Sequence, residues 1–281
     1  MLDLKEQLKG ILRTVGLYET AHRLWDRRPD LRVTCQNAGY RLAGAPDGLP
    51  IPPLRLIYLA ILSTDVSWFL RSGRFGQESI LRTLERNRLR MEDFHAVLDF
   101  GCGCGRLLRH WCSLEGRRLY GTDCNPEMVA WCREKLGHVG EFQVNQLTPP
   151  LSYSCDKFDF IYSISVFTHL TENLQQAWME ELRRVLQPVG YLLITVHGES
   201  RLHQLSPEER ARFRAGQLVV KHATAAGTNV CGAYHPHQYV LNHLVSALKV
   251  VDFIPRGCRD TDQDIFLLQK QREPHFRVAK G

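Results

Sequence analysis

The stretch VLDFGCGCGRLLRHW at residues 97–111 holds the residue types and spacings best suited to chemistry. Its apolar run ends in an acid, and glycines and cysteines then alternate: Asp99, Gly101, Cys102, Gly103, Cys104 and Gly105. Two cysteines could ligate a metal or form a redox pair, whereas glycines let a backbone approach a ligand closely. Cysteines that bind zinc are usually two to four residues apart, and these are separated by a single residue. We therefore interpret the cysteines as small packing residues and expect no metal site.

A second acid, Asp123, ends the next apolar segment, RLYGTDC at residues 118–124. Ligands of parallel sheets bind at the carboxyl ends of the strands, where a carboxylate can accept hydrogen bonds from both ribose hydroxyls. The glycine loop and Asp123 together predict a site for an adenosine-containing cofactor. A pyrophosphate cradle is disfavoured, because Arg106 stands where the dinucleotide fingerprint G-x-G-x-x-G requires its third glycine, and no P-loop Lys-Ser/Thr follows.

Strands and helices must alternate from residue 95 onward to position these residues. We expect strands at 96–100, 118–124, 141–145, 158–165, 191–197, 249–254 and 264–270. Helices between the first five strands indicate a parallel sheet with helices on both faces. The last two strands have no helix between them and should pair antiparallel.

Capping residues and glycines mark the helices. Asn125-Pro126-Glu127 begins a helix that ends at Gly137, and Ser206 begins another with capping-box spacing to Glu209. A helix should follow the glycine loop from Arg106, and further helices are expected at 53–71, 77–89, 172–187 and 236–248. Residues 44–53, GAPDGLPIPP, are interpreted as a linker. Residues 2–25 predict an amphipathic helix whose apolar stripe packs on its own domain, or whose basic face meets a membrane surface or a partner.

The chain resembles the class I S-adenosylmethionine-dependent methyltransferases in VLDFGCGCG, GTDCNPEMV, FDFIYSISVFTHL and LRRVLQPVGYLLITV, over roughly residues 95–200. The resemblance implies an α/β fold with a Rossmann-like, mostly parallel seven-stranded sheet, an antiparallel last strand and an N-terminal helical cap. It implies S-adenosyl-L-methionine as cofactor, bound by Asp99, Gly101, Gly103, Gly105, Asp123, Cys124, Met128, Asn145, Gln146 and Ser163. Gln146 departs from a common Asp, and Val189 replaces a usual Gly in the turn before the fifth strand.

Histidines are the candidates for a general base, because their pKa lies near neutrality. His169 follows the fourth strand, and His235 belongs to a segment, residues 200–240, that should cover the acceptor; both are candidate catalytic residues. The candidate substrate residues are Tyr58, Trp68, Phe69, His197 and Tyr234. For the aromatic residues, lining of the site and ordinary helix core remain equal alternatives.

Composition limits the functional classes. A charge of +6 on 281 residues is a mild basic excess, so no nucleic-acid partner is expected, and no apolar run is long enough for an integral membrane segment. Nine cysteines and no secretory signal indicate a reduced, cytoplasmic setting. We expect an N-terminal extension at 1–75 and a methyltransferase domain at 76–275, and a homodimer is possible.

The function that we predict is O-methylation of a small-molecule or glycan-like metabolite. An RNA or protein methyltransferase and a non-catalytic cofactor-binding module are the alternatives. A nicotinamide-dependent reductase is disfavoured by Arg106.

Overall fold

The computed structural model describes residues 31–245 and 247–272, in two parts that are treated separately. The first is helix α3, Leu31–Ala43, and the second begins at Gly44. The amphipathic helix predicted at 2–25 lies outside the described residues. No helix of the described part combines the length and apolarity that crossing a membrane requires.

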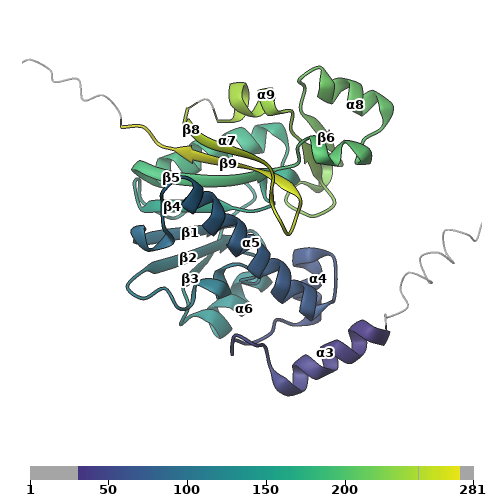
Figure 1. Cartoon of the computed structure of the whole chain (residues 1–281), viewed down its shortest axis with the longest axis vertical. Coiled ribbons are helices and arrows are strands. Elements are labelled where there is room, and N and C mark those ends of the chain that lie inside the picture. The colour runs from purple at the N-terminus through teal and green to yellow at the C-terminus, as the bar shows by residue number, and fades with distance from the viewer. Residues whose placement is uncertain (1–30, 246, 273–281) are drawn as a thin grey trace, which may run out of the picture. The chain divides into compact units, whose positions relative to one another are not determined.

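From Gly44 onward, the described residues form a seven-stranded sheet with the order β3-β2-β1-β4-β5-β9-β8, seen from bottom to top in Figure 1. The strands are β1 Ala96–Phe100, β2 Arg118–Asp123, β3 Glu141–Val144, β4 Phe158–Ser163, β5 Leu186–Val196, β8 Lys249–Cys258 and β9 Gln263–Gln269. Strands β1 to β5 are parallel, and β9 pairs antiparallel with both β5 and β8. The α/β, Rossmann-like fold and its antiparallel last strand are confirmed.

Helices cover both faces of this sheet, because alternate residues of each buried strand point to opposite sides. On one face, Val97 of β1 packs with α5, Val66–Arg86, and α6, Pro126–Leu136. On the other, Leu98 packs with α7, Glu172–Val185, and with the helical segment formed by α9, His237–Tyr239, and η6, Val240–Leu244. The strand ends that carry the candidate residues are thereby held in one rigid layer.

The N-terminal helices divide at a different place from the one predicted. Helix α4, Leu54–Ile61, ends at Leu62, whose φ of 54° is left-handed, and α5 begins after Asp65, whose carboxylate accepts a hydrogen bond from the Trp68 backbone N–H. The expected break near Ser72-Gly73 is wrong. A Cβ on Gly73 would lie 2.2 Å from the Arg106 carbonyl oxygen, so this glycine lets α5 approach the glycine loop.

The helix expected from Arg106 is also wrong. Turns and a short 3-10 segment, Leu108–Trp111, connect the glycine loop to β2. Only eleven residues separate Arg106 from Arg118 at the start of β2, and the close approach of α5 at Gly73 occupies the space beside them.

The 44–53 segment is not a loose linker. The buried guanidinium of Arg109 binds the carboxylate of Asp47 through two hydrogen bonds, of 2.6 and 2.8 Å. It also donates to the carbonyl oxygens of Leu49 and Pro50, each at 3.2 Å. Four hydrogen bonds from one side chain therefore attach this segment, which directly precedes α4, to the 3-10 segment Leu108–Trp111.

Both capping predictions are confirmed. The Asn125 side chain accepts hydrogen bonds from the N–H groups of Glu127 and Met128 at the start of α6. Ser206 and Glu209 form a reciprocal capping box on α8, Pro207–Arg214. Helix α8 belongs to the 200–240 segment, which also holds a small antiparallel sheet of β6, Val219–Lys221, and β7, Gly232–Tyr234.

Val189→Gly is expected to stabilise the protein by about 1 kcal/mol. Val189 has a φ of +63°, which costs an L-residue roughly 1–2 kcal/mol, and a part of this gain is offset by the flexibility of glycine in the unfolded chain. Urea unfolding measures the change. Val230→Gly, at another exposed valine without a positive φ, should not stabilise. Equal effects of the two substitutions would contradict the prediction.

Candidate functional site

The glycine loop after β1 is shaped by left-handed backbone. Gly101, Gly103 and Gly105 have φ values of 85°, 54° and 75°, which L side chains rarely adopt. The space is restricted too, because a Cβ on Gly101 would lie 2.2 Å from Val166 and one on Gly105 would lie 2.5 Å from Leu136. The thiols of Cys102 and Cys104 are buried. The neighbouring Cys132 thiol and burial raise the pKa of Cys102, and burial raises that of Cys104, so these residues fill space under the loop.

Asp123, at the end of β2, binds the glycine loop to the start of α6. One carboxylate oxygen accepts a hydrogen bond of 2.8 Å from Gly103 N, and the other accepts one of 2.8 Å from Asn125 N. Each oxygen keeps a further lone pair, and Asp123 lines the cavity described below. Burial raises the pKa of Asp123, while the two backbone N–H donors act in the opposite direction. The arrangement can accept two more hydrogen bonds from a ligand.

Asp99, the last acid of β1, is buried with an unpartnered oxygen. Its Oδ2 has no hydrogen-bond partner among the described residues, although the carboxyl group as a whole accepts a hydrogen bond from the Tyr162 hydroxyl. Burial raises the pKa of Asp99 to about 7, although Tyr162 and Arg106 act in the opposite direction. Arg106 is itself paired with Asp260, at 2.6 Å. An orphaned acceptor of this kind fits a cationic group of a ligand.

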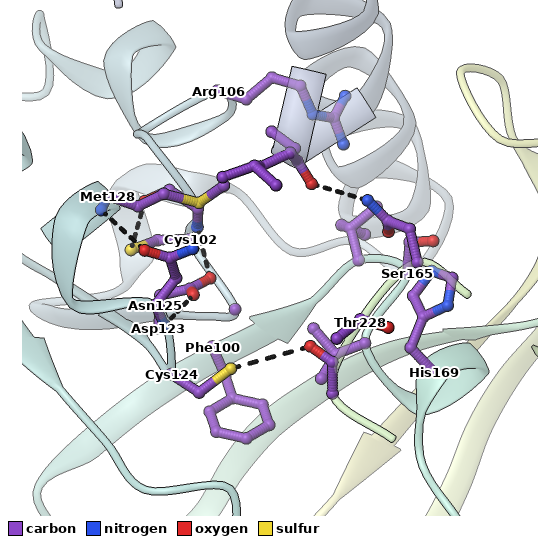
Figure 2. Close-up of a pocket in the computed structure, with 18 of the residues that line it drawn as sticks. Phe100, Cys102, Arg106, Asp123, Cys124, Asn125, Met128, Ser165, His169 and Thr228 are labelled. Carbon is purple, nitrogen blue, oxygen red and sulfur yellow. Dashed lines mark hydrogen bonds between the residues drawn. The ribbon is translucent and has the colours of Figure 1, made fainter. Parts of the chain in front are cut away.

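A cavity of about 420 Å³ joins these acids to the ends of β3 and β4. Of the predicted cofactor residues, it is lined by Asp99, Gly101, Gly103, Asp123, Cys124, Met128, Asn145 and Gln146. Figure 2 shows Asp123, Cys102 and Met128 on one side of the cavity, and Ser165 and His169 on the other. Asn145 Oδ1 is a further buried acceptor without a described partner.

Two segments cover this cavity. Helix α4 contributes Tyr58, Leu59 and Ala60, and the loop 227–230 of the 200–240 segment contributes the rest of the cover. The loop is joined to α4 by a hydrogen bond of 2.7 Å from Asn229 Nδ2 to the Leu59 carbonyl, and to Cys124 by a long contact of 3.9 Å from the thiol to the Gly227 carbonyl, drawn in Figure 2. Asn229 and Gly227 thus place the loop over the glycine loop and β2 end.

His169 is the predicted base that lines the cavity. Its Nδ1 lies 2.7 Å from the Cys231 carbonyl oxygen. A carbonyl can only accept, so Nδ1 carries the proton and Nε2 is left with a free lone pair. Burial lowers the pKa of His169, which keeps the ring neutral at pH 7. His169 therefore has both the position and the tautomer that a general base needs.

The second predicted base, His235, does not reach the cavity. It is buried, and its Nε2 lies 3.0 Å from Gln175 Oε1. Burial lowers its pKa to about 3. His197 and Tyr234 are also absent from the cavity wall: His197 lies 3.2 Å from Gln263 Nε2, and the Tyr234 hydroxyl donates to Gln204. These three residues pack together at the base of the 200–240 segment: His197 pairs with Tyr234, the last residue of β7, and its carbonyl oxygen accepts a hydrogen bond from His235 N at 2.8 Å.

Four other predicted residues also lie outside the cavity wall. Phe69 is fully buried on the core side of α5, with the Arg109 guanidinium 5.9 Å from its ring centre. Trp68 is half-buried on a different side of the helix and packs edge to face on Phe75. Of the three aromatic candidates in α4 and α5, Tyr58 alone reaches the cavity. Ser163 is buried within β4, and Gly105 packs against α6.

Ser165, two residues beyond the predicted Ser163, lines the cavity instead. Its φ is +62°, and its backbone N–H donates to Thr195 Oγ1 at 2.8 Å. Gln263 of β9 donates to its hydroxyl at 2.8 Å. Sequence reasoning also missed Phe100, Asn125, Val166, Leu170 and the loop 227–230. The turn residues of AGTNV at 226–230 were a usable signal for that loop.

Comparisons with known proteins agree with this geometry. Residues 97–190 match a family model described as a methyltransferase domain. The chain is 31% identical over 128 residues to a malonyl-[acyl-carrier protein] O-methyltransferase of Enterobacter lignolyticus, covering 46% of this chain and 47% of that protein. It is 30% identical over 112 residues to the methyltransferase GfsG of Streptomyces halstedii, covering 38% and 39%. The match thus spans less than half the length of these curated relatives.

A solved S-adenosylmethionine-dependent methyltransferase of Clostridium acetobutylicum has the same fold. The TM-score is 0.54 at 13% identity, with 77% of this chain and 97% of that chain covered.

Proposed function

Since the chain belongs to the class I S-adenosylmethionine-dependent methyltransferases, we propose that it methylates an oxygen atom of a small-molecule acceptor, with His169 as the general base. The observation that carries the proposal is the position of His169 on the cavity wall, with Nδ1 committed to the Cys231 carbonyl.

The residues present fit S-adenosylmethionine. The unpartnered Oδ2 of Asp99 suits the ammonium group of its methionine part, and the remaining lone pairs of Asp123 suit the two ribose hydroxyls. Asn145 and Gln146, at the end of β3, offer amide groups to the adenine edge. When bound, the cofactor supplies an electrophilic methyl group on a sulfonium centre. Neutral His169 and the apolar wall formed by Tyr58, Val166 and Leu170 place no competing cation beside that charge.

His169 has a defined task in this reaction. Its Nε2 takes the proton of an acceptor hydroxyl as that oxygen attacks, whereas a carboxylate acceptor is already ionised at neutral pH and needs no base. The Cys231 carbonyl keeps the ring oriented while the imidazolium forms, because it holds the Nδ1 proton throughout. Positioned bases of this kind contribute roughly 10²–10⁴-fold to a rate. The name of the Enterobacter relative, which acts at oxygen, supports the same atom type for this acceptor.

Radiolabelled cofactor tests the proposal. The protein is incubated with methyl-labelled S-adenosylmethionine and a cell extract, and the products are separated into small molecules, RNA and protein. Label should enter the small-molecule fraction. Label in RNA or protein would favour the rival methyltransferase classes, and cofactor binding without any transfer would favour a non-catalytic module.

His169→Ala is expected to lower turnover by roughly 10²–10⁴-fold while the affinity for S-adenosylhomocysteine changes less than about twofold. The labelled transfer assay and calorimetry measure the two quantities. His203→Ala is a matched control, because His203 Nδ1 also contacts a backbone carbonyl, that of Ser200, but lies off the cavity wall. Unchanged turnover in His169→Ala would exclude the base.

Turnover should also fall in acid as His169 becomes protonated. A base acts only when deprotonated, and burial lowers the pKa of His169, so the acid limb is expected below pH 6.5. We also propose a cytoplasmic setting, a homodimer and an acceptor other than a nucleic acid.

A further inference from the structure

Exposed apolar side chains gather at the mouth of the cavity. In the described residues from Gly44 onward, the exposed large hydrophobic residues are Tyr58, Leu59, Leu62, Val144, Leu147, Val189 and Val230. Five of these seven line the cavity: Tyr58, Leu59, Leu62, Leu147 and Val230. We call these five residues the apolar rim. Exposed apolar groups that cluster in this way, rather than being scattered singly, mark a binding surface.

The rim is built from three separate segments. Tyr58 and Leu59 belong to α4 and Leu62 ends it, Leu147 follows β3, and Val230 belongs to the covering loop. The Asn229–Leu59 hydrogen bond joins α4 to the loop at this place. Leu62 and Val230 remain 58% and 62% exposed, so their burial does not contribute to the fold and they are available to a ligand.

The cavity is too small for cofactor and acceptor together. Its volume of about 420 Å³ is near the lower end of the roughly 300–1,000 Å³ that holds one drug-sized ligand. With S-adenosylmethionine along the glycine loop, only the reacting group of an acceptor can enter beside His169. The remainder of the acceptor must lie at the mouth, on the apolar rim.

Charge at the cavity excludes several other occupants. The acidic and basic residues of its described wall, histidine aside, are Asp99, Arg106 and Asp123, and Arg106 is paired with Asp260. Arg55 of α4 and Glu127 of α6 are paired with each other. The rim thus offers no unpaired cation to the phosphates of a nucleic acid or to an acidic protein.

We propose that the acceptor is amphipathic: a hydroxyl or carboxyl group that enters beside His169, attached to an apolar chain or ring system that lies on the apolar rim. This proposal rests on the proposed function and selects, within it, an apolar acceptor over a glycan-like one. The rim then determines specificity, because its burial favours the acceptor by an amount that grows with the apolar area covered.

Aliphatic alcohols as probes test the proposal without knowledge of the natural acceptor. The protein is saturated with S-adenosylhomocysteine, and 1-hexanol, 1-octanol, 1-decanol and methyl glucoside are titrated by calorimetry. Affinity should rise about two- to fourfold per methylene group along the alcohols, as expected for burial of a methylene, and the glucoside should bind far more weakly.

Two substitutions and a matched control locate the probe. Leu62→Asn and Val230→Asn should each lower the octanol affinity about three- to tenfold, while the affinity for S-adenosylhomocysteine stays the same. Val189→Asn is the control: like Leu62, Val189 is exposed with a left-handed φ, which asparagine tolerates, but it lies off the cavity. It should leave octanol binding unchanged.

Three outcomes would overturn the inference. They are an affinity that does not depend on chain length, a glucoside that binds as well as octanol, and a dimer that Leu62→Asn dissociates, which would assign the rim to a second copy of the chain. A failure of S-adenosylhomocysteine to bind would instead overturn the proposed function. The two failures are therefore distinguishable.

Discussion

Asp123→Ala is expected to lower the affinity for S-adenosylmethionine by at least about 100-fold. Hydrogen bonds to a charged group contribute roughly 1.5–3 kcal/mol each, and two ribose hydroxyls would lose this carboxylate. The substitution also removes the acceptor of the Gly103 N–H, so the glycine loop loses one of its fixed positions. Calorimetry with S-adenosylmethionine and S-adenosylhomocysteine measures the loss.

Asp159→Ala separates this effect from a general loss of structure. Asp159 also accepts two backbone hydrogen bonds, from His95 N at 2.7 Å and Ala96 N at 2.9 Å, but at the opposite end of β1 and off the cavity wall. Its removal should cost stability and leave cofactor affinity unchanged. Wild-type affinity in Asp123→Ala would refute the assignment of the ribose site.

Asp47→Ala is expected to reduce the free energy of unfolding by roughly 3–5 kcal/mol, because it leaves the guanidinium of Arg109 buried without its counter-charge. Although burial acts to raise it, the pKa of Asp47 is lowered overall by Arg109. The stabilisation by this pair is therefore fully present above pH 3.8 and is lost as the pH falls through the lowered pKa. Urea unfolding at pH 7 measures the change.

Asp93→Ala is the comparison, because Asp93 pairs with Arg90 at an exposed position and its loss should hardly change stability. The double substitution Asp47→Leu and Arg109→Met should recover much of the loss, since it removes both charges. A small effect of Asp47→Ala alone would show that water or another group reaches Arg109.

The sheet and the cofactor loop were predictable because their signals are local. Alternating glycines after an apolar strand predict a turn with left-handed backbone. The positive φ values at Gly101, Gly103 and Gly105 agree with that prediction. The Asn125 cap could also be predicted from the sequence, since its side chain accepts hydrogen bonds from residues only two and three positions away. The valine at position 189, where the family usually has glycine, adopts the left-handed conformation that glycine favours.

The incorrect predictions concern features that are determined by contacts between residues distant in the sequence. Ser72-Gly73 indicated a helix break, but α5 continues through them because Gly73 lets the helix pack on the glycine loop at Arg106, 33 residues away in the sequence. The 44–53 segment has the composition of a linker, yet the side chain of Arg109, which follows the glycine loop, fixes it in place. His235 and His169 are alike as residue types, and only the tertiary fold decides that one faces the cavity and the other faces Gln175.

The buried carboxyl of Asp99 makes cofactor binding a proton-linked event. Burial raises its pKa to about 7, so that a part of the free protein carries this proton at neutral pH, and an ammonium group beside Oδ2 would favour its release. The heat of binding would then depend on the ionisation enthalpy of the buffer. Affinity would also weaken below neutrality, so that the pH of the surroundings would adjust how much of the protein is loaded.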